Sequence, residues 1–565
     1  MKQFKAIMIK NRLWVSVYVL AGIALAFLNN FLADYSQTLI DRFSAGTLSL
    51  GVIVFYGTML LIQCVGNYLD EYPGRKLEHG IYLDLKLAAL EKTSRIDFLA
   101  YQQLSLGRLL QQIETGSAAG RDIFLGFYLE TIRSLLPSML FGLFFIFCQS
   151  RSIALSVLAG YFIVFAVTRL LLKTLYRWKE KILTGEESFH HYLTRGLTEM
   201  VMFRLNRRFR FEIDKATQAR DQIVSGKIKT TLIHEAFFTI FAILVTLIKT
   251  GVLVYAWKTG AISIGAAIAL MALVDHAYTP IAIFNVLFVG YKLNRTAFDR
   301  YARFLDEKED EQLFSGAPAP RLRGELEAQG LHFDYGTRPV LRGVSVKVAA
   351  GETVALVGPS GCGKTTLIRL FAGLLKAQNG QIRVDGIPLQ TLALDGYYAH
   401  LTYVPQESPV FDGTLRENIV FDAPVQDEQI LAALDCVCLG NWVRSLPQGL
   451  WTRLGARGMT LSGGERQRLA LARLWFSKNE IVLLDEATSA LDARTERLVL
   501  HRVREQIQGH TLIVIAHRLK AIQDFDRIVV FDKGVVAAQG CYEELLHKDA
   551  LFAGLVKAEE KSDVD

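Results

Sequence analysis

A glycine-rich segment in the second half of the chain constrains the possible fold most strongly. It reads Gly358-Pro359-Ser360-Gly361-Cys362-Gly363-Lys364-Thr365, follows the apolar run 353–357 and precedes a helical pattern at 367–370. A buried strand that ends in glycines and opens a helix directs several backbone N–H groups to one point, where the helix dipole also favours an anion. Lys364 can reach the β- and γ-phosphates of a nucleotide, and the Thr365 hydroxyl can bind Mg²⁺. The segment therefore predicts a phosphate-binding loop, in which Cys362 occupies a variable position.

Composition indicates that part of the chain lies in a membrane. The 565 residues exceed the size of a single domain, and 51% of them are hydrophobic, which is high for a soluble protein of this length. The net charge of +7 could indicate a nucleic-acid partner, but the excess basic residues flank apolar segments, as membrane topology requires. We therefore expect no nucleic acid among the partners. The six cysteines form no paired framework, and we interpret them as free thiols.

Long apolar runs occupy the first half of the chain. They lie at 13–32, 50–69, 124–148, 153–172, 232–257 and 261–289. Each is long enough to cross a bilayer, which takes about 20 residues. The connecting segments 71–121 and 173–229 hold 7 and 13 Lys and Arg residues, whereas the three short loops hold only Arg42, Arg151 and Lys258. Because cytoplasmic loops carry an excess of Lys and Arg, we expect the long segments and both termini in the cytoplasm.

A break in composition marks the predicted domain boundary. The charged run 306–311 is followed by Gly316-Ala317-Pro318-Ala319-Pro320 without hydrophobic periodicity, which is typical of a linker. From about Glu325 strand patterns alternate with helix patterns, as in a soluble α/β domain. The predicted fold class is an all-α six-helix transmembrane domain (1–315), a linker (316–324) and an α/β P-loop nucleotide-binding domain (325–565).

Two further segments add to a nucleotide site. The run 481–486 predicts a buried strand that delivers Asp485 and Glu486 at its end, where ligands of open parallel sheets bind. Asp485 suits a Mg²⁺ ligand, and Glu486 suits a general base that polarises the attacking water. The segment 461–468, Leu-Ser-Gly-Gly-Glu-Arg-Gln-Arg, places glycines at a second helix start. Since the chain already has a phosphate loop, this helix end suits the γ-phosphate of a nucleotide held by another copy of the domain.

With these motifs the whole chain resembles a half-transporter of the ATP-binding cassette superfamily, in which an exporter-type membrane domain precedes the nucleotide-binding domain. The resemblance implies ATP and Mg²⁺ as cofactors. It implies that Tyr335 stacks on adenine, that the segment from Gly358 to Thr366 binds the phosphates, and that His517 contacts the γ-phosphate. Gln406 would sense Mg²⁺ and water. Ser462, Gly463 and Gly464 would close on the ATP of the partner. Asp492 would lie in a loop that crosses the dimer interface.

The resemblance also implies an assembly and a location. The functional unit is expected to be a dimer, with a homodimer as the default because every catalytic element is present. Short coupling helices are expected near 97–101 and 201–204. Just before the segment 461–468, which resembles the signature motif of the family, related exporters carry Gly-Glu-Arg-Gly. This chain has Gly455-Ala456-Arg457-Gly458 there, so one charged contact is expected to be missing. We expect an integral protein of a bacterial inner membrane.

These motifs are compatible with more than one function. The leading one is an ATP-driven exporter of a peptide or another small amphipathic molecule, working by alternating access. The alternative is an importer of a siderophore or metal chelate that is built on the same exporter fold, and the motifs do not separate the two. The apolar spans exclude a soluble ATPase that acts on nucleic acid. An ATP-gated channel would call for a long regulatory insertion, and the sequence has none.

Polar residues inside the apolar runs are the candidates for a cargo pathway. Asp275 and His276 lie in the middle of the sixth run, Lys249 lies in the fifth, and Gln63 and Asn67 lie in the second. Because ionisable groups inside spans are costly, they face cavities or partners. The alternative for Asp275 is a structural bond to a neighbouring helix. Adjacent helical residues point about 100° apart, so at most one of Asp275 and His276 is expected to face the cavity directly.

Overall fold

The computed structural model describes residues 7–104, 106–260, 262–336, 339–455 and 459–562. The chain forms two compact units. The first comprises Met1–Ser94 and Leu104–Glu307, and the second comprises Arg95–Gln103 and Lys308–Asp565.

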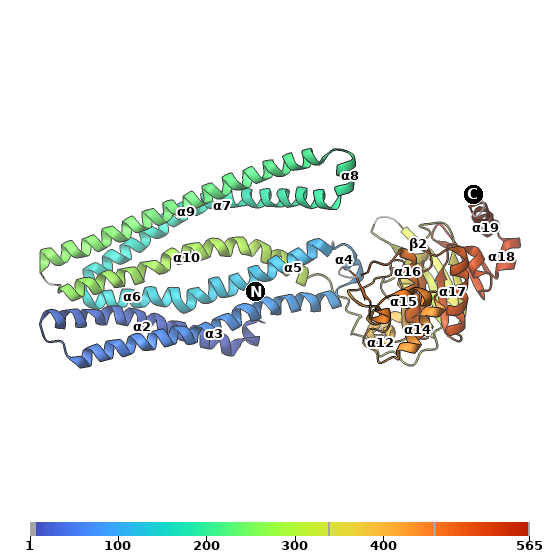
Figure 1. The fold of residues 1–565 in the computed structure, drawn as a ribbon, viewed down its shortest axis with the longest axis horizontal. Helices are drawn as coiled ribbons and strands as arrows, with labels where there is room; N and C mark the ends of the chain where they lie inside the picture. Colours follow the sequence, from blue (N-terminus) through green and yellow to red (C-terminus); the bar gives the residue numbers. More distant parts are fainter. Residues whose placement is uncertain (1–6, 105, 261, 337–338, 456–458, 563–565) are drawn as a thin grey trace. The chain divides into compact units, whose positions relative to one another are not determined.

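The first unit consists of helices (Figure 1). In chain order they are α2 (Arg12–Ser44), α3 (Leu50–Arg95), α5 (Leu106–Arg121), the π-helical segments η1 (Asp122–Leu129) and η2 (Thr131–Leu135), α6 (Leu136–Gln149), α7 (Arg151–Thr198), α8 (Met200–Leu205), α9 (Phe209–Thr259) and α10 (Ile264–Leu305). Helices α3 and α7 continue far beyond the second and fourth apolar runs.

Five helices in the described part of the chain are long and apolar enough to cross a membrane. They are Arg12–Ser44, Leu50–Arg95, Leu109–Gln149, Phe209–Thr259 and Ile264–Leu305. The remaining predicted span, 153–172, lies on α7, where the apolar stretch Arg151–Val167 is shorter. The fold class of a helical membrane region followed by an α/β domain is confirmed, whereas the direction in which the helices cross the membrane remains a prediction.

Helix α10 is the centre of the first unit, where it packs against α2, α5 and α6. Its buried face has helical spacing and includes Leu270, Leu273, Val274, Ala277, Tyr278 and Ile281. A Cβ on Gly142 would lie 3.2 Å from the Cβ of Ala277, so this glycine lets α6 approach α10 closely. The Tyr278 hydroxyl donates to the carbonyl oxygen of Val157 at 2.7 Å, which gives this buried hydroxyl a partner.

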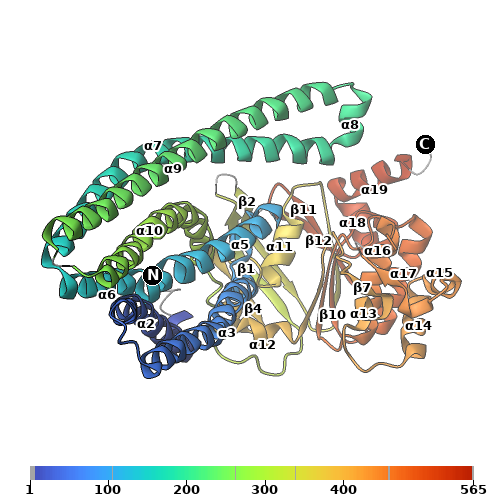
Figure 2. The ribbon, with the colours of Figure 1, turned by 60° about the vertical axis from the view of Figure 1, so that its left-hand side comes forward.

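The second unit contains three sheets (Figure 2). The six-stranded sheet has the order β12-β11-β3-β10-β9-β6 and is parallel except for β12. Its strands are β3 (Thr353–Val357), β6 (Leu401–Val404), β9 (Ile481–Asp485), β10 (Thr511–Ile515), β11 (Arg527–Asp532) and β12 (Val535–Gly540). A four-stranded antiparallel sheet, β2-β1-β4-β5, contains β1 (Leu326–Asp334), β2 (Pro339–Val348), β4 (Asn379–Val384) and β5 (Ile387–Pro388). The third sheet pairs β7 (Gly413–Thr414) with β8 (Arg453–Leu454).

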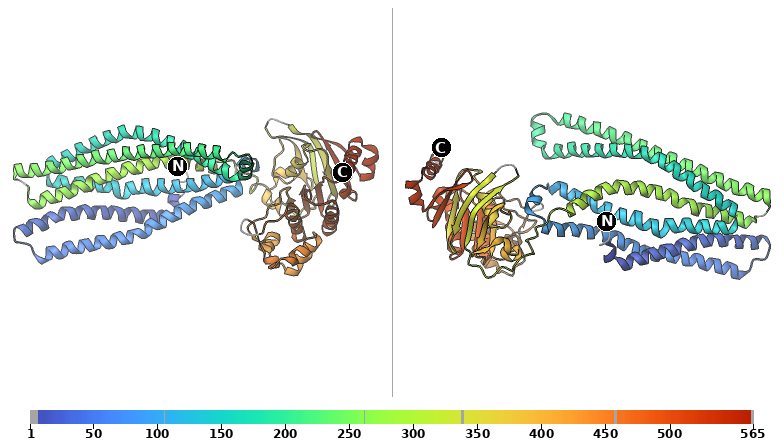
Figure 3. Two further views of the ribbon diagram at one scale, coloured as in Figure 1. Left: turned by 45° about the horizontal axis from the view of Figure 1, so that its top comes forward. Right: turned by 180° about the vertical axis from the view of Figure 1, so that it is seen from behind.

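Helices cover both faces of the six-stranded sheet (Figure 2). Side chains of β3, β9 and β10 alternate between two hydrophobic cores, one shared with α11 (Lys364–Phe371) and the other with α16 (Gly463–Ala472) and α17 (Ala493–Gln506). The central strands are buried on both faces, which explains why their sequences are continuous apolar runs. The remaining helices are α12 (Leu394–Tyr398), α13 (Leu415–Val420), α14 (Asp427–Cys436), α15 (Gly440–Ser445), α18 (Tyr542–Lys548) and α19 (Ala550–Ser562), and Figure 3 shows them from two further sides.

The short helix α4 (Phe98–Gln102) belongs to the second unit. Its N-cap residue, Asp97, accepts hydrogen bonds from the amides of Leu99 and Ala100. The Asp97 amide donates to the carbonyl oxygen of Lys308 at 3.0 Å, and Phe98 and Leu99 pack against the core that contains α11. Residues 308–315, which the sequence analysis assigned to the membrane domain, therefore pack with the second unit.

We expect Gly116→Ala to destabilise the first unit. A Cβ at Gly116 would lie 2.2 Å from the Cβ of Tyr301, which is fully buried and donates to the carbonyl oxygen of Leu85 at 2.6 Å. Overpacking of this kind costs about 1–3 kcal/mol, so the thermal midpoint of the detergent-purified protein should fall by several degrees. The matched control is Gly80→Ala on α3, where the added Cβ meets no atom within 4 Å. Equal midpoints for the two variants would contradict this packing.

Candidate functional site

The phosphate loop connects β3 to α11, as its sequence predicts. Gly358 has φ +141°, and a Cβ there would lie 2.1 Å from the carbonyl oxygen of Phe531. Gly363 has φ +109° and is the N-cap of α11, where a Cβ would lie 2.6 Å from Cδ2 of Leu341. Only glycine combines these backbone angles with so close an approach. The loop therefore leaves its backbone amides near the helix N-terminus, which is the arrangement that binds phosphate.

Lys364 and Thr365 follow the loop in the first turn of α11. The Lys364 ammonium donates to the carbonyl oxygens of Gly358 at 2.8 Å and Pro359 at 3.0 Å, so it folds back over the loop. The Thr365 hydroxyl donates to Oδ1 of Asp485 at 2.9 Å. This bond joins the phosphate loop to the end of β9, two segments that lie 120 residues apart in the sequence.

Asp485 is fully buried at the end of β9. Its second oxygen, Oδ2, accepts a hydrogen bond from the Tyr403 hydroxyl at 3.0 Å. Burial raises the pKa of this carboxyl, whereas the hydrogen bonds from Thr365 and Tyr403 act in the opposite direction. The sequence analysis did not assign a role to Tyr403, although its position on β6 beside β9 follows from the strand pairing.

Glu486 lies one residue beyond β9 and has φ +53°, a conformation that few non-glycine residues adopt. One carboxylate oxygen lies 2.8 Å from Nε2 of His517, and the other accepts from Nε2 of Gln406 at 2.5 Å. Both neighbours come from other parts of the sheet, since Gln406 follows β6 and His517 follows β10. The structure thus brings together the three residues that the sequence analysis named as catalytic. Strained backbone of this kind is common at functional sites.

The signature segment, 461–468, begins α16. Ser462 is the N-cap and forms a capping box with Glu465, and a Cβ at Gly464 would lie 3.1 Å from the carbonyl oxygen of Ala490. Gln467, four residues after Gly463, donates to Oγ of Ser489 at 3.0 Å and accepts from the amide of Ala490 at 2.8 Å. Gln467 is not among the site residues predicted from the sequence, although its spacing from Gly463 on the helix was an available signal.

The segment 489–492 continues directly into α17, for which Asp492 is the N-cap. The Asp492 carboxylate accepts from the amide of Thr495 at 3.0 Å. Because Gln467 also holds the amide of Ala490, the signature helix and this segment form one connected element.

A cavity of about 730 Å³ lies beside the signature segment. Its lining includes Gln406, Gly463 and Gln467. Among the described residues that line it, none comes from the phosphate loop 358–365. Within the described part of one chain, the signature segment therefore lines this cavity without the phosphate loop.

Tyr335 follows β1 and is nearly half exposed. Its ring packs edge-on against Phe333, with 4.9 Å between the ring centroids, and its hydroxyl lies 3.4 Å from Oγ1 of Thr366. The aromatic side chain thus lies beside the first turn of α11, where a base could stack on it while phosphates lie on the loop.

The residues predicted to bind Mg²⁺ fit that ion in part. Thr365 and Asp485 supply a hydroxyl and a carboxylate whose oxygens are 2.9 Å apart, and oxygen ligands are those that Mg²⁺ prefers. Gln406 instead donates its side-chain amide to Glu486. The described residues contain no group of three or more His, Cys, Asp or Glu side chains that could hold a metal by themselves. Phosphate oxygens would therefore have to complete the coordination.

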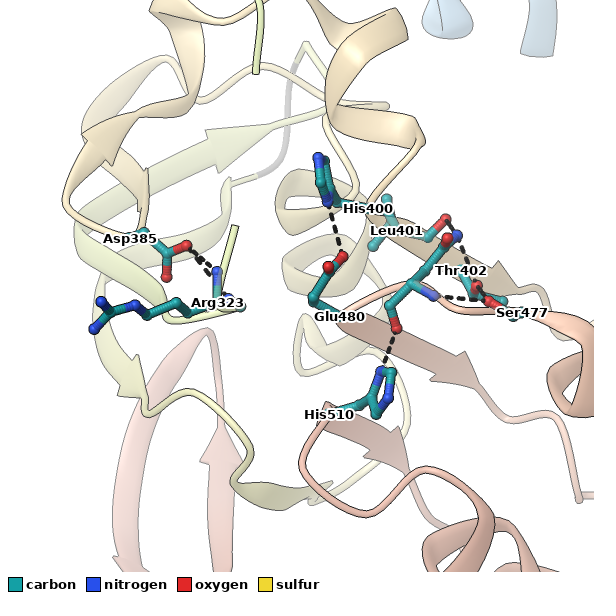
Figure 4. Close-up of polar contacts among 10 residues, drawn as sticks. Arg323, Asp385, His400, Leu401, Thr402, Ser477, Glu480 and His510 are labelled. Atoms are coloured by element: carbon teal, nitrogen blue, oxygen red, sulfur yellow. Dashed lines mark hydrogen bonds and ion pairs between the residues drawn. The ribbon is translucent and has the colours of Figure 1, made fainter. Parts of the chain in front are cut away.

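Polar residues also gather at the opposite edge of the sheet, where the parallel strands begin (Figure 4). His400 precedes β6, Glu480 precedes β9 and His510 precedes β10. Nδ1 of His400 lies 2.8 Å from Oε2 of Glu480, and Nδ1 of His510 lies 2.7 Å from the carbonyl oxygen of Asn479. Because ligands of parallel sheets bind at the carboxyl ends of the strands, we interpret this group as structural.

The structure pairs two of the proposed cargo residues. Nζ of Lys249 on α9 lies 2.6 Å from Oδ2 of Asp275 on α10, which is the bond to a neighbouring helix that the sequence analysis gave as the alternative. Nδ1 of the adjacent His276 is buried and has no hydrogen-bond partner in the described part of the chain. Gln63 instead contacts Asn29 of α2, and Asn67 is exposed. The altered segment 455–458 before the signature lies, apart from Gly455, outside the described residues.

Comparison with known proteins found chains that are similar to this one. Residues 341–489 match the family described as ABC transporter. The chain is 42% identical over 266 residues to the ATP-dependent lipid A-core flippase of Cupriavidus pinatubonensis, an alignment that covers 46% of this chain and 45% of that protein. It spans about half the length of the flippases that it matches.

Two further comparisons extend over most of the chain. It is 27% identical over 525 residues to the uncharacterized ABC transporter ATP-binding protein YknV of Bacillus subtilis, covering 88% of this chain and 86% of that protein. The structure of a bacterial Atm1-family ABC exporter with ATP bound superposes with a TM-score of 0.82 and covers 98% of this chain and 99% of that chain, at 24% identity. Residues 341–489 thus match the ABC transporter family, and the fold of the chain, a helical membrane region followed by an α/β unit, is that of this exporter structure.

Proposed function

We propose that the chain is the half-transporter of an ATP-driven exporter and that ATP binding and hydrolysis in its second unit drive movement of a cargo through the first. The observation that carries this proposal is the convergence of Gln406, Glu486 and His517 beside a phosphate loop that is bonded to Asp485. A carboxylate held by two other polar side chains at the edge of a phosphate site suits the activation of water.

The proposed roles follow from the geometry of each side chain. Lys364 would exchange its carbonyl partners for the β- and γ-phosphates, and Tyr335 would stack on the base. Glu486 would polarise the attacking water, while His517 would contact the γ-phosphate. Bound Mg²⁺, held by Thr365 and Asp485, would neutralise charge on the phosphates. Phosphoryl transfer depends mainly on positioning and charge neutralisation, and fixed neighbours supply both.

We further propose that two copies of the chain form the functional unit. Among the described residues, the cavity beside the signature segment has no phosphate-loop residue in its lining, so each nucleotide would need the signature segment of the second copy. The amides at the start of α16 would then face the γ-phosphate across the interface. A homodimer with two equivalent sites is the simplest assembly, since one chain supplies all the elements.

The predicted coupling segments coincide with two short helices. The first, α4, packs within the second unit. The second, α8, connects α7 to α9 and exposes four apolar side chains: Met200, Val201, Met202 and Leu205. Apolar side chains exposed together suit a protein contact. We propose that α8 docks on the ATP-binding unit of the second copy.

For the cargo we propose a peptide or another small amphipathic molecule, moved outward across a bacterial inner membrane, with both termini in the cytoplasm. An aromatic group on η1 and α10 supports an amphipathic cargo. Phe127 stacks on Tyr291 with 4.6 Å between the ring centroids, and Phe284 stacks on Phe288 at 5.9 Å. Arg295 adds a positive charge beside these rings, since its Nη1 donates to the hydroxyl of Tyr291 at 3.2 Å. Import of a siderophore or metal chelate is the alternative.

We expect Glu486→Gln and Lys364→Ala to separate hydrolysis from binding. Loss of the Glu486 carboxylate removes the proposed base, so ATP turnover should fall by a factor of about 10² or more while ATP affinity is retained. Loss of the Lys364 ammonium removes the charge that faces the phosphates, so ATP affinity itself should fall. Equilibrium binding of a fluorescent ATP analogue and phosphate release measure the two quantities. Equal losses of affinity in both variants would refute the division of roles.

We expect ATP to bring two copies together through the signature segment. In the Glu486→Gln background, which should retain bound ATP, cross-linking between copies should rise with ATP, and Ser462→Arg should abolish the rise by blocking the start of α16. The control is Ser445→Arg, an exposed hydroxyl residue at the end of α15. A purified monomer that hydrolyses ATP at the full rate would contradict the dimer.

The Asp275–Lys249 pair allows a cargo role to be distinguished from a structural one. Asp275→Asn leaves the Lys249 ammonium without its carboxylate and should lower both thermal stability and transport. The double variant Asp275→Asn with Lys249→Met removes both charges and should regain the stability. If the pair contacts cargo, the double variant still fails to transport in proteoliposomes. Transport at the wild-type rate in the stable double variant would assign the pair a structural role only.

A further inference from the structure

A second cavity, of about 660 Å³, lies in the ATP-binding unit between α17, the short helix η6 (Leu519–Ile522) and Glu559 of α19. Helices α17 and α19 are labelled in Figure 1. The residues that line it do not include any residue assigned above to ATP. Its basic lining residues are Arg494, Arg497, His501, Arg504, Arg518 and Lys520.

The basic residues of α17 form a stripe along the cavity. Arg494, Arg497, His501 and Arg504 are spaced by three, four and three residues, which places them on one face of the helix. Arg494 and Arg497, three residues apart, carry like charges that repel each other on this face. An anion bound against this face would remove that repulsion.

The positive charge of the cavity is only partly neutralised by the protein. Its lining carries five Arg and Lys side chains and two carboxylates, those of Asp524 and Glu559. Oε2 of Glu559 accepts from the amide of Leu519 at 2.8 Å. One of the five cations, Arg518, is paired outside the lining with the buried Glu496, at 3.2 Å. An excess of positive charge remains on the α17 side.

Arg504 adds an unused donor to this wall. Its Nε is buried and has no hydrogen-bond partner in the described part of the chain. Its guanidinium carbon lies 5.1 Å from the ring centroid of Phe525, so the planar group is held in place by the ring. A fixed guanidinium presents donors in the fork geometry that matches phosphate oxygens.

We propose that this cavity is an anion-binding site, separate from the ATP site, that takes a small molecule carrying two or more phosphate groups. The volume lies within the range of small-molecule pockets, about 300–1,000 Å³. Arg494 and Arg497 supply the exposed charges that attract the anion, and Arg504 supplies the held guanidinium at the wall.

The cavity also touches the proposed hydrolytic site through Arg518. Nη1 of this residue donates to the carbonyl oxygen of Leu491, in the segment that precedes Asp492. His517, which precedes Arg518 in the chain, lies 2.8 Å from Glu486. An anion that bound Arg518 would therefore affect both the segment before Asp492 and the position of His517. This part of the inference rests on the proposed function.

The test measures pyrophosphate binding by calorimetry to the full chain carrying Lys364→Ala, which weakens the phosphate loop as a competing site. We expect binding, and we expect Arg494→Gln with Arg497→Gln to weaken it at least tenfold. The matched control is Lys478→Gln, which removes an exposed charge outside the cavity and should change the affinity less than twofold.

Three outcomes would overturn the site. They are loss of all pyrophosphate binding in the Lys364→Ala protein itself, unchanged affinity in the Arg494 and Arg497 double variant, and equal weakening by Lys478→Gln. Thermal midpoints without ligand confirm that each variant is folded. Because no hydrolysis is measured, failure of this site leaves the proposed ATPase untouched, and the ATPase rate of the double variant tests the link through Arg518 separately.

Discussion

The parallel alignment of β3, β10 and β9 is the constraint on which the site depends. The three strands are neighbours in the sheet, so the segments that follow them meet at one edge. Lys364 and Thr365 come from the first, His517 from the second and Asp485 and Glu486 from the third. The hydrogen bond from Thr365 to Asp485 holds the phosphate loop against the end of β9. The contact of His517 with Glu486 holds the segment after β10 against the next residue of the same chain segment.

The membrane unit is organised by close helix contacts. Water-free packing requires that helices approach through small residues and that buried hydroxyls find partners, because lipid offers no hydrogen bonds. Gly142 opposite Ala277 meets the first requirement, and the bond from Tyr278 to Val157 meets the second. The Asp275–Lys249 pair brings charge into this setting, and so it is either structural or part of the cargo pathway.

Much of the fold could be predicted because its signals are local. The apolar runs fall on long helices, and the alternation of strand and helix patterns after 325 corresponds to the α/β unit. The boundary between the units could not be read in the same way, because 308–315 and α4 join the second unit through packing and hydrogen bonds with residues remote in the chain. The same holds for Gln467 and Tyr403, whose partners are defined only by the folded sheet.

The sequence by itself determined the phosphate loop and the identity of the residues at the ends of the strands, because these depend on residue types at fixed spacing. Tertiary structure alone decided which side chains meet. Asp275 pairs with Lys249 of the neighbouring helix, although no spacing along the chain relates the two. The stripe of α17 becomes one wall of a cavity only when η6 and Glu559 of α19 lie beside it. Such contacts depend on distances in space between remote segments, which local pattern does not contain.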